Sequence, residues 1–275
     1  MRMDRVLTVA RIDLRRLLKS RDYWIPMSLL AGLFFVVVPF VMLSVVTSAS
    51  GTANELVGQI GGVLDALPGP VQENIQGATP AARAAYAFAV YLLAPVAIIV
   101  PLTISSAVAA QTLVGERERG TGEFFAHSPL TEREMYLGKL ISSLVPGFIA
   151  TAVGFGAYSL IVNLRVGPEF GGWFFPTAGW WLLIVWVVPP FIAIALSVIL
   201  WVSSRVKSTA AAQQAASLVS LPVIVASYAV SSGLLFDPTL AALIIGSIAW
   251  VIAIIGLISG SNALRRERLL SVGID

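Results

Sequence analysis

Residues 84–114 read AAYAFAVYLLAPVAIIVPLTISSAVAAQTLV, a run of 31 residues that contains no Asp, Glu, Lys, Arg or His. A helix needs about 20 apolar residues to cross the ~30 Å hydrocarbon core of a bilayer, so this run predicts a transmembrane helix. Because it is longer than one straight crossing requires, we expect it to extend beyond the bilayer or to bend at Pro95 or Pro101.

Five further uncharged apolar runs have the length of a span. They cover residues 24–46, 140–164, 179–202, 215–236 and 240–260. Of the 275 residues, 57% are hydrophobic and only 12% are charged, about half the charged fraction of a soluble domain. The composition therefore excludes an ordinary soluble enzyme. It predicts an all-α integral membrane protein in which residues 1–275 form one domain with six transmembrane helices.

The lysines and arginines are distributed unevenly among the connections between these runs. Of the 18, sixteen fall before the first run, after the last and in alternate connections between, and the other connections hold two. Because cationic loops resist translocation, this asymmetry predicts that both termini are cytoplasmic.

The segment 1–23 is amphipathic at helical spacing. Apolar residues fall on one side, namely Leu7, Ala10, Leu14, Leu17 and Leu18. Cations fall on the other side, namely Arg5, Arg11, Arg15, Arg16 and Lys19. The pattern predicts a helix lying in the cytoplasmic membrane interface, anchored by these cations to anionic headgroups of the lipid bilayer. The alternative is a topology signal whose amphipathicity is incidental.

The connection 48–83 also contains a helical pattern. Its apolar positions are Leu56, Ile60, Val63, Leu64 and Leu67, and the sequence Pro68-Gly69-Pro70 ends the run. We expect a short amphipathic helix in this extracytoplasmic loop, either as a lid over the outer mouth or as a packed cover without a gating role. At the same surface, Trp173, Trp180 and Trp181 are expected to form an aromatic belt.

Several kinds of chemistry are missing from the chain. There is no cysteine and only one histidine, His127, so thiolate metal sites and histidine clusters are excluded. The six runs contain no ionisable residue to carry a coupling ion. Gly138-Lys139 lacks the remaining residues of a phosphate-binding loop. We therefore expect no cofactor on this chain, and its energy must come from a partner.

The most informative connection is 115–139, which with Leu140 reads GERERGTGEFFAHSPLTEREMYLGKL. Five glutamates face four cations there, so this inner loop is locally acidic. Gly120 and Gly122 interrupt the helix leaving the membrane, and Thr121 can cap a short helix carrying Glu123, Phe124 and Phe125. After Ser128-Pro129, the residues Thr131 and Glu134 have capping-box spacing.

This loop resembles the signature loop of permease subunits in the type-2 ABC (ATP-binding cassette) exporter superfamily. The matching motifs are Glu-x-Glu-x-Gly-Thr-x-Glu, an apolar pair, Ser-Pro-Leu-Thr and Leu-Gly-Lys. The resemblance implies a coupling helix that docks into a separate ATPase subunit through Glu116, Glu118, Gly120, Thr121, Glu123, Phe124, Phe125, Ser128 and Pro129. Gly122 and the aromatic pair depart from the usual pattern. The alternative is a solvated charged connector with a capped helix end.

The resemblance also implies the partners and the function. We expect an exporter in a prokaryotic plasma (inner) membrane, built with a second permease subunit as a homodimer or heterodimer. Two ATPase chains would hold ATP and magnesium, and no nucleic acid is expected. The exported solute would be an amphiphilic drug, a lipid or sodium. The alternative is a membrane anchor or mechanotransmission subunit of an ATPase-driven assembly complex that passes no solute itself.

Overall fold

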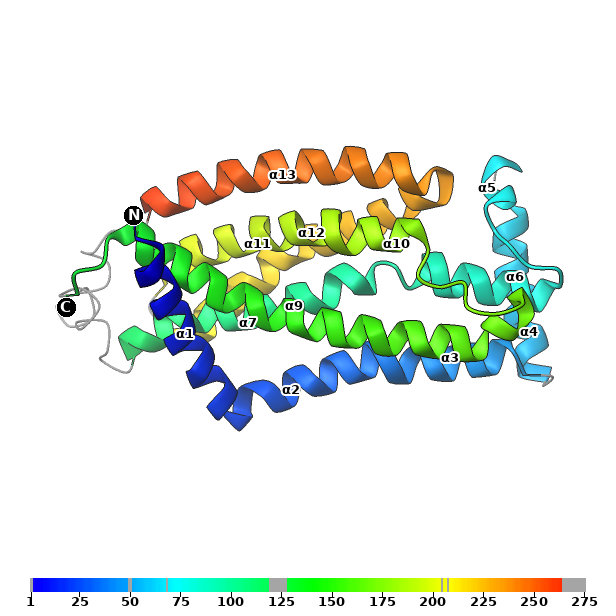
Figure 1. The fold of residues 1–275 in the computed structure, drawn as a ribbon, viewed down its shortest axis with the longest axis horizontal. Helices are drawn as coiled ribbons and strands as arrows, with labels where there is room; N and C mark the ends of the chain where they lie inside the picture. The colour runs from blue at the N-terminus through cyan, green and yellow to red at the C-terminus, as the bar shows by residue number, and fades with distance from the viewer. Residues whose placement is uncertain are drawn as a thin grey trace.

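The computed structural model of the chain describes residues 2–48, 51–67, 69–118, 128–203, 205–206 and 208–263. Six helical segments in these ranges are long and apolar enough to cross a membrane, which confirms the predicted number of spans. They run alongside one another in an elongated bundle (Figure 1).

Three of the spans are assembled from consecutive helical pieces. The first span consists of α2 (Arg21–Gly32), the π-helix η1 (Leu33–Val37) and α3 (Val38–Val46). The second consists of α6 (Pro80–Ala87), the π-helix η2 (Phe88–Leu92) and α7 (Val96–Glu118). The fourth consists of α10 (Ala178–Leu182), the π-helix η4 (Leu183–Val187) and α11 (Val188–Ser203).

The other spans are single helices, and short helices connect or precede them. The third, fifth and sixth spans are α9 (Glu132–Arg165), α12 (Thr209–Phe236) and α13 (Pro238–Ala263). The N-terminal helix is α1 (Met3–Lys19). Between spans lie α4 (Gly51–Asp65), α5 (Gly69–Glu73) and the 3-10 helix η3 (Gly167–Phe170).

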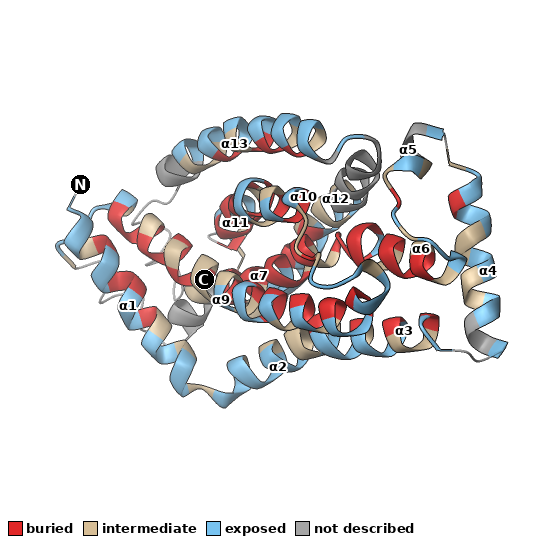
Figure 2. Ribbon diagram, turned by 45° about the vertical axis from the view of Figure 1, so that its right-hand side comes forward, coloured by how far each residue is buried: buried red, intermediate tan, exposed pale blue. Residues whose placement is uncertain are grey.

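The second and fourth spans form the centre of the bundle. In the most apolar stretch of each, 72% and 56% of the residues are buried, whereas the first and sixth spans reach only 22%. Figure 2 shows the buried residues concentrated in α6, α7 and α11. The outer helices therefore present long apolar faces to lipid or to a partner chain.

The two ends of the bundle differ in content. The N-terminus, α1 and the end of α13 lie at one end, and α4, α5 and the start of α6 lie at the other (Figure 1). Six crossings thus return the chain to the end where it began. The end of α7 and the start of α9 also lie at the α1 end.

The second span breaks where the sequence analysis placed one of its two candidate bends. Residues Leu93–Pro95 form a turn between η2 and α7, whereas Pro101 lies inside the continuous helix α7. Proline has no N–H to donate, so a break at Pro95 leaves backbone carbonyls without their helical partners.

Two aromatic side chains bond to the carbonyls at this break. The Tyr158 hydroxyl donates to the Ala89 carbonyl, and the Trp180 indole Nε1 donates to the Val90 carbonyl at 2.8 Å. Non-helical backbone is tolerated at membrane depth only where protein groups satisfy it. The prediction that Trp180 belongs to the aromatic belt at the outer surface is wrong. This residue is 2% exposed, and its indole donates to a backbone carbonyl of the second span. Trp173 and Trp181 are exposed.

The predicted amphipathic helix in the connection 48–83 corresponds to α4, which begins earlier than expected, at Gly51. It packs against α3 and α6. Leu64 is buried and Ile60 is half-buried, but Val63 is 62% exposed, so Val63 does not belong to the packed face. Val57 packs against the core in its place. The lid and the passive cover both stay predictions.

Candidate docking surface

The connection between α7 and α9 is described only at its two ends. Gly120, Thr121, Glu123, Phe124 and Phe125 lie outside the described residues.

The remaining predicted docking residues flank this gap. Glu116 and Glu118 belong to the last turn of α7. Description resumes at Ser128, which is half-buried, and Pro129, which is exposed. The docking roles of all these residues stay predictions.

The predicted capping box at the start of α9 is confirmed. The Thr131 hydroxyl accepts from the Glu134 amide at 3.2 Å, and the Glu134 carboxylate accepts from the Thr131 amide at 3.0 Å. These two bonds satisfy N–H groups that a helix start otherwise leaves without partners. The N-cap residue Thr131 is therefore held in place two residues after Pro129.

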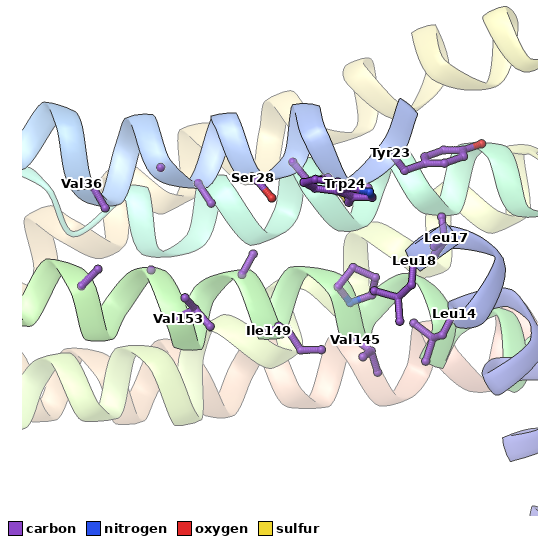
Figure 3. Close-up of a pocket in the computed structure, with 17 residues that line it drawn as sticks. Leu14, Leu17, Leu18, Tyr23, Trp24, Ser28, Val36, Val145, Ile149 and Val153 are labelled. Atoms are coloured by element: carbon purple, nitrogen blue, oxygen red, sulfur yellow. The ribbon is translucent and has the colours of Figure 1, made fainter. Parts of the chain in front are cut away.

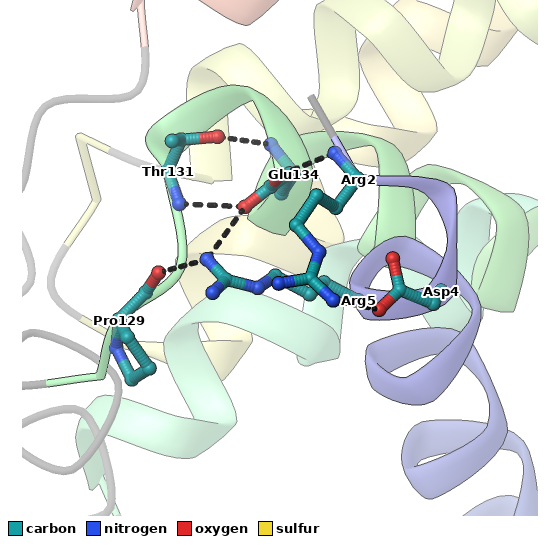
Figure 4. Close-up of polar contacts among 6 residues, drawn as sticks. All are labelled: Arg2, Asp4, Arg5, Pro129, Thr131 and Glu134. Carbon is teal, nitrogen blue, oxygen red and sulfur yellow. Dashed lines mark hydrogen bonds and ion pairs between the residues drawn. The ribbon is translucent and has the colours of Figure 1, made fainter.

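The same carboxylate also holds the start of α1. Its Oε1 accepts from the Arg2 backbone N–H at 2.7 Å, and its Oε2 lies 3.9 Å from Arg5 Nη1. Arg5 Nη1 also donates to the Pro129 carbonyl at 2.6 Å (Figure 4). Glu134 is 2% exposed, so one buried negative charge sits at the positive N-terminal ends of two helices. The N-terminal helix is thus tied to the segment that leads into the loop.

Two turns into α9, a glycine lets α1 approach closely. A Cβ placed on Gly138 would lie 2.7 Å from the Cβ of Val9 and 3.1 Å from the Val6 carbonyl oxygen. Only a residue without a side chain leaves room for this contact. The glycine of the Leu-Gly-Lys motif therefore marks the point where α1 packs on α9.

The lysine of that motif is buried against α1. Lys139 is 1% exposed, and its Nζ lies 3.5 Å from Oδ2 of Asp13, which is 6% exposed. The ammonium also donates to the Thr112 carbonyl in α7 at 3.1 Å, and the Ser142 hydroxyl donates to Asp13 at 3.5 Å. A buried charge in a membrane protein is expensive unless it is paired. This cluster joins α1, α7 and α9 next to the loop.

The family is shown by a comparison with known proteins. A family model described as ABC-2 family transporter protein matches residues 7–240, which include most of α1, both ends of the loop and five of the six spans. The chain belongs to the ABC-2 transporter family. A search of curated proteins finds no match. Membership makes it a multi-pass membrane protein and a permease subunit that is not itself catalytic. It also implies association with an ABC ATPase.

Within the permease, α1 has three faces rather than the two predicted. Val6, Val9 and Asp13 are buried against α9. Leu7 and Leu18, on the predicted lipid side, are 54% and 73% exposed and thus remain available to a bilayer. Ala10, predicted on the same side, is 3% exposed and belongs to the buried face instead.

The cations of α1 do not all lie alike. Arg11, Arg15, Arg16 and Lys19 are exposed, whereas Arg5 is half-buried against the loop. The interfacial position of α1 and the headgroup contacts of these cations stay predictions.

The sequence analysis did not identify Asp13 as a functional position. The signal that could have found it is Lys139, a charge that directly precedes a long apolar run and so requires a buried partner. Within the residues that the structure describes, no three His, Asp or Glu side chains lie close enough together to hold a metal ion.

Proposed function

We propose that this permease is the membrane-spanning subunit of an ATP-driven exporter in a prokaryotic plasma (inner) membrane. It works as a dimer with a second permease subunit, and two separate ATPase chains bind ATP and magnesium. The connection 115–139 carries the coupling helix that docks on the ATPase. The end of the bundle that carries α1 and this loop faces the cytoplasm, in keeping with the cationic connections at that end.

The observation that supports this proposal is that buried charged residues fix the C-terminal end of the connection 115–139 to neighbouring helices. Glu134 ties the start of α9 to α1, and Lys139 ties α9 to both α1 and α7. A loop that only connects two spans does not require buried ion pairs and hydrogen bonds to other helices. A displacement of this connection by an ATPase therefore moves three helices together, and α7 carries it into the centre of the bundle.

Several hydroxyl groups of the spans form hydrogen bonds to protein groups and give no evidence of a polar path through the bundle. Thr103 and Ser143 donate to carbonyls one turn earlier in their own helices. The hydroxyl oxygens of Ser106 and Ser220 lie 3.3 Å apart, and their hydrogen bond links α7 to α12. The substrate class therefore rests on the family resemblance alone, as an amphiphilic drug, a lipid or sodium leaving the cytoplasm.

The test is reconstitution of the permease in vesicles with an ABC ATPase encoded next to it. Wild-type complex should move a solute from a panel of amphiphilic drugs, lipids and sodium when ATP is added. Phe124→Asp places a charge on the proposed docking helix, so it should abolish ATP-driven transport while membrane insertion is kept. Trp173→Asp is the matched control, because it makes the same kind of change on an exposed aromatic at the opposite end.

Three outcomes separate the possibilities. Normal transport by Phe124→Asp would contradict docking through this loop. Hydrolysis of ATP by the isolated permease would contradict the proposal that a separate ATPase chain hydrolyses the nucleotide. If the complex hydrolyses ATP but moves no solute of the panel, the permease is instead a mechanotransmission subunit that acts on an outer partner.

A further inference from the structure

An apolar groove lies on the side of the bundle between the first and third spans. One wall is α2 and Val36 of η1, the other wall is α9, and α1 closes one end (Figure 3). Its volume is about 480 Å³. Ile149 and Val153 in its wall are 59% and 70% exposed, so the groove opens onto the surface that faces the bilayer.

The groove lies beside a close contact between the two spans. A Cβ on Gly154 would lie 2.3 Å from the ring of Phe35 in η1, so the helices are in direct contact there. Between that contact and α1, small residues such as Ser28, Ala31 and Ala150 line the walls and leave the space open.

The length of the groove suits one acyl chain. The α9 wall runs from Val145 to Ala157, roughly 18 Å at 1.5 Å per residue, close to the ~15 Å depth of one leaflet.

The end of the groove at α1 carries positive charge. Lys19 and Arg21 are exposed in the turn between α1 and α2, and Leu18 and Tyr23, within two residues of them, line the groove. Arg15 is exposed one turn earlier on α1. The three cations outnumber the one exposed carboxylate beside them, Asp22, and Asp13 is buried against Lys139.

We propose that this groove binds one acyl chain of an anionic glycerophospholipid, whose phosphate lies at the turn formed by Lys19 and Arg21. The apolar walls take the chain over the depth of one leaflet, and the cations select the charged headgroup. The bound lipid completes the contact between α1, α2 and α9, where the protein's own side chains leave the groove open.

Photolabelling of the purified full chain in lipid nanodiscs tests this site. The probes are phosphatidylglycerol and phosphatidylcholine carrying the same photoreactive group on one acyl chain. We expect labelling of the peptides that contain 24–36 and 145–157, severalfold stronger with phosphatidylglycerol. Excess unlabelled phosphatidylglycerol should reduce labelling of these peptides but not of α13.

Two variants address the two halves of the site. Ala150→Phe fills the groove and should lower labelling by both probes severalfold, whereas Val251→Phe, on the exposed face of α13, should not. Joint replacement of Lys19→Gln and Arg21→Gln should lower phosphatidylglycerol labelling to the level of phosphatidylcholine.

The proposal is overturned by any of three results. Equal labelling by the two lipids in the wild type removes the headgroup selection. Unchanged labelling of Ala150→Phe, or no competition by unlabelled lipid, removes the acyl site. Crosslinks from the groove residues to a second copy of the chain would assign this face to an interface between subunits.

Discussion

Lys139 and Asp13 lie 126 positions apart in the chain, yet their side chains meet at 3.5 Å in the interior of the protein. Both are almost fully buried, and the lysine also reaches the Thr112 carbonyl of α7. The ion pair thus fixes the N-terminal helix to the span that follows the connection 115–139. Its position makes α1 a packed part of the bundle.

Breaking this ion pair from one side should destabilise the permease strongly. Asp13→Leu or Lys139→Met leaves one buried charge without a partner, which costs about 3–5 kcal/mol. The double variant removes both charges and should recover most of that loss. Thermal unfolding of the detergent-purified protein measures the difference. If the loss of stability in the double variant equals the sum of the losses in the two single variants, the two side chains do not interact.

The contact of α1 with Gly138 should tolerate no side chain. Gly138→Ala forces Val9 or the whole of α1 to move, and overpacking of this kind costs about 1–3 kcal/mol. Gly156 lies in the same helix with open space around it, so Gly156→Ala should be neutral or stabilising by up to about 1 kcal/mol. The melting temperatures of the two variants should shift in opposite directions or by clearly different amounts. Equal shifts would argue against the close approach of α1.

Removal of the Glu134 carboxylate should loosen the starts of two helices. Glu134→Ala takes away the acceptor for the amides of both Arg2 and Thr131, so hydrogen exchange should accelerate at the N-terminal ends of α1 and α9. Thr131→Ala removes only the α9 cap, at about 1 kcal/mol, and should accelerate exchange in α9 alone. Unchanged exchange in α1 of Glu134→Ala would show that the carboxylate does not hold that helix.

Trp180 and Trp181 are adjacent in sequence and should respond very differently to the same change. Trp180→Phe leaves the Val90 carbonyl without its donor in a buried part of the bundle, at about 1–3 kcal/mol. Trp181 is 54% exposed, so Trp181→Phe should be close to neutral. The melting temperatures of the two purified variants test this prediction. A neutral Trp180→Phe would mean that the broken second span does not depend on this bond.

The number and approximate limits of the six spans were predictable from the amino-acid sequence. Membrane insertion depends on apolar content summed over a local window, and a local sum can be read without knowing any partner. The capping box at Thr131 and Glu134 was predictable for a related reason, since both residues lie within one turn of each other. The break at Pro95 follows from the missing N–H of proline, although Pro101 was an equal candidate and lies in an intact helix.

Three features could not be predicted without the fold: which side of α1 is buried, which carboxylate pairs with Lys139, and why Trp180 is not at the surface. Each of these depends on a residue far away in the chain, and helical periodicity reports which residues share a face but not what that face meets. The amphipathic pattern of α1 concealed a third face, because Val6, Val9 and Asp13 do not form an apolar stripe. The physical reason is that burial of a charge is decided by its partner, and a partner is a property of the fold.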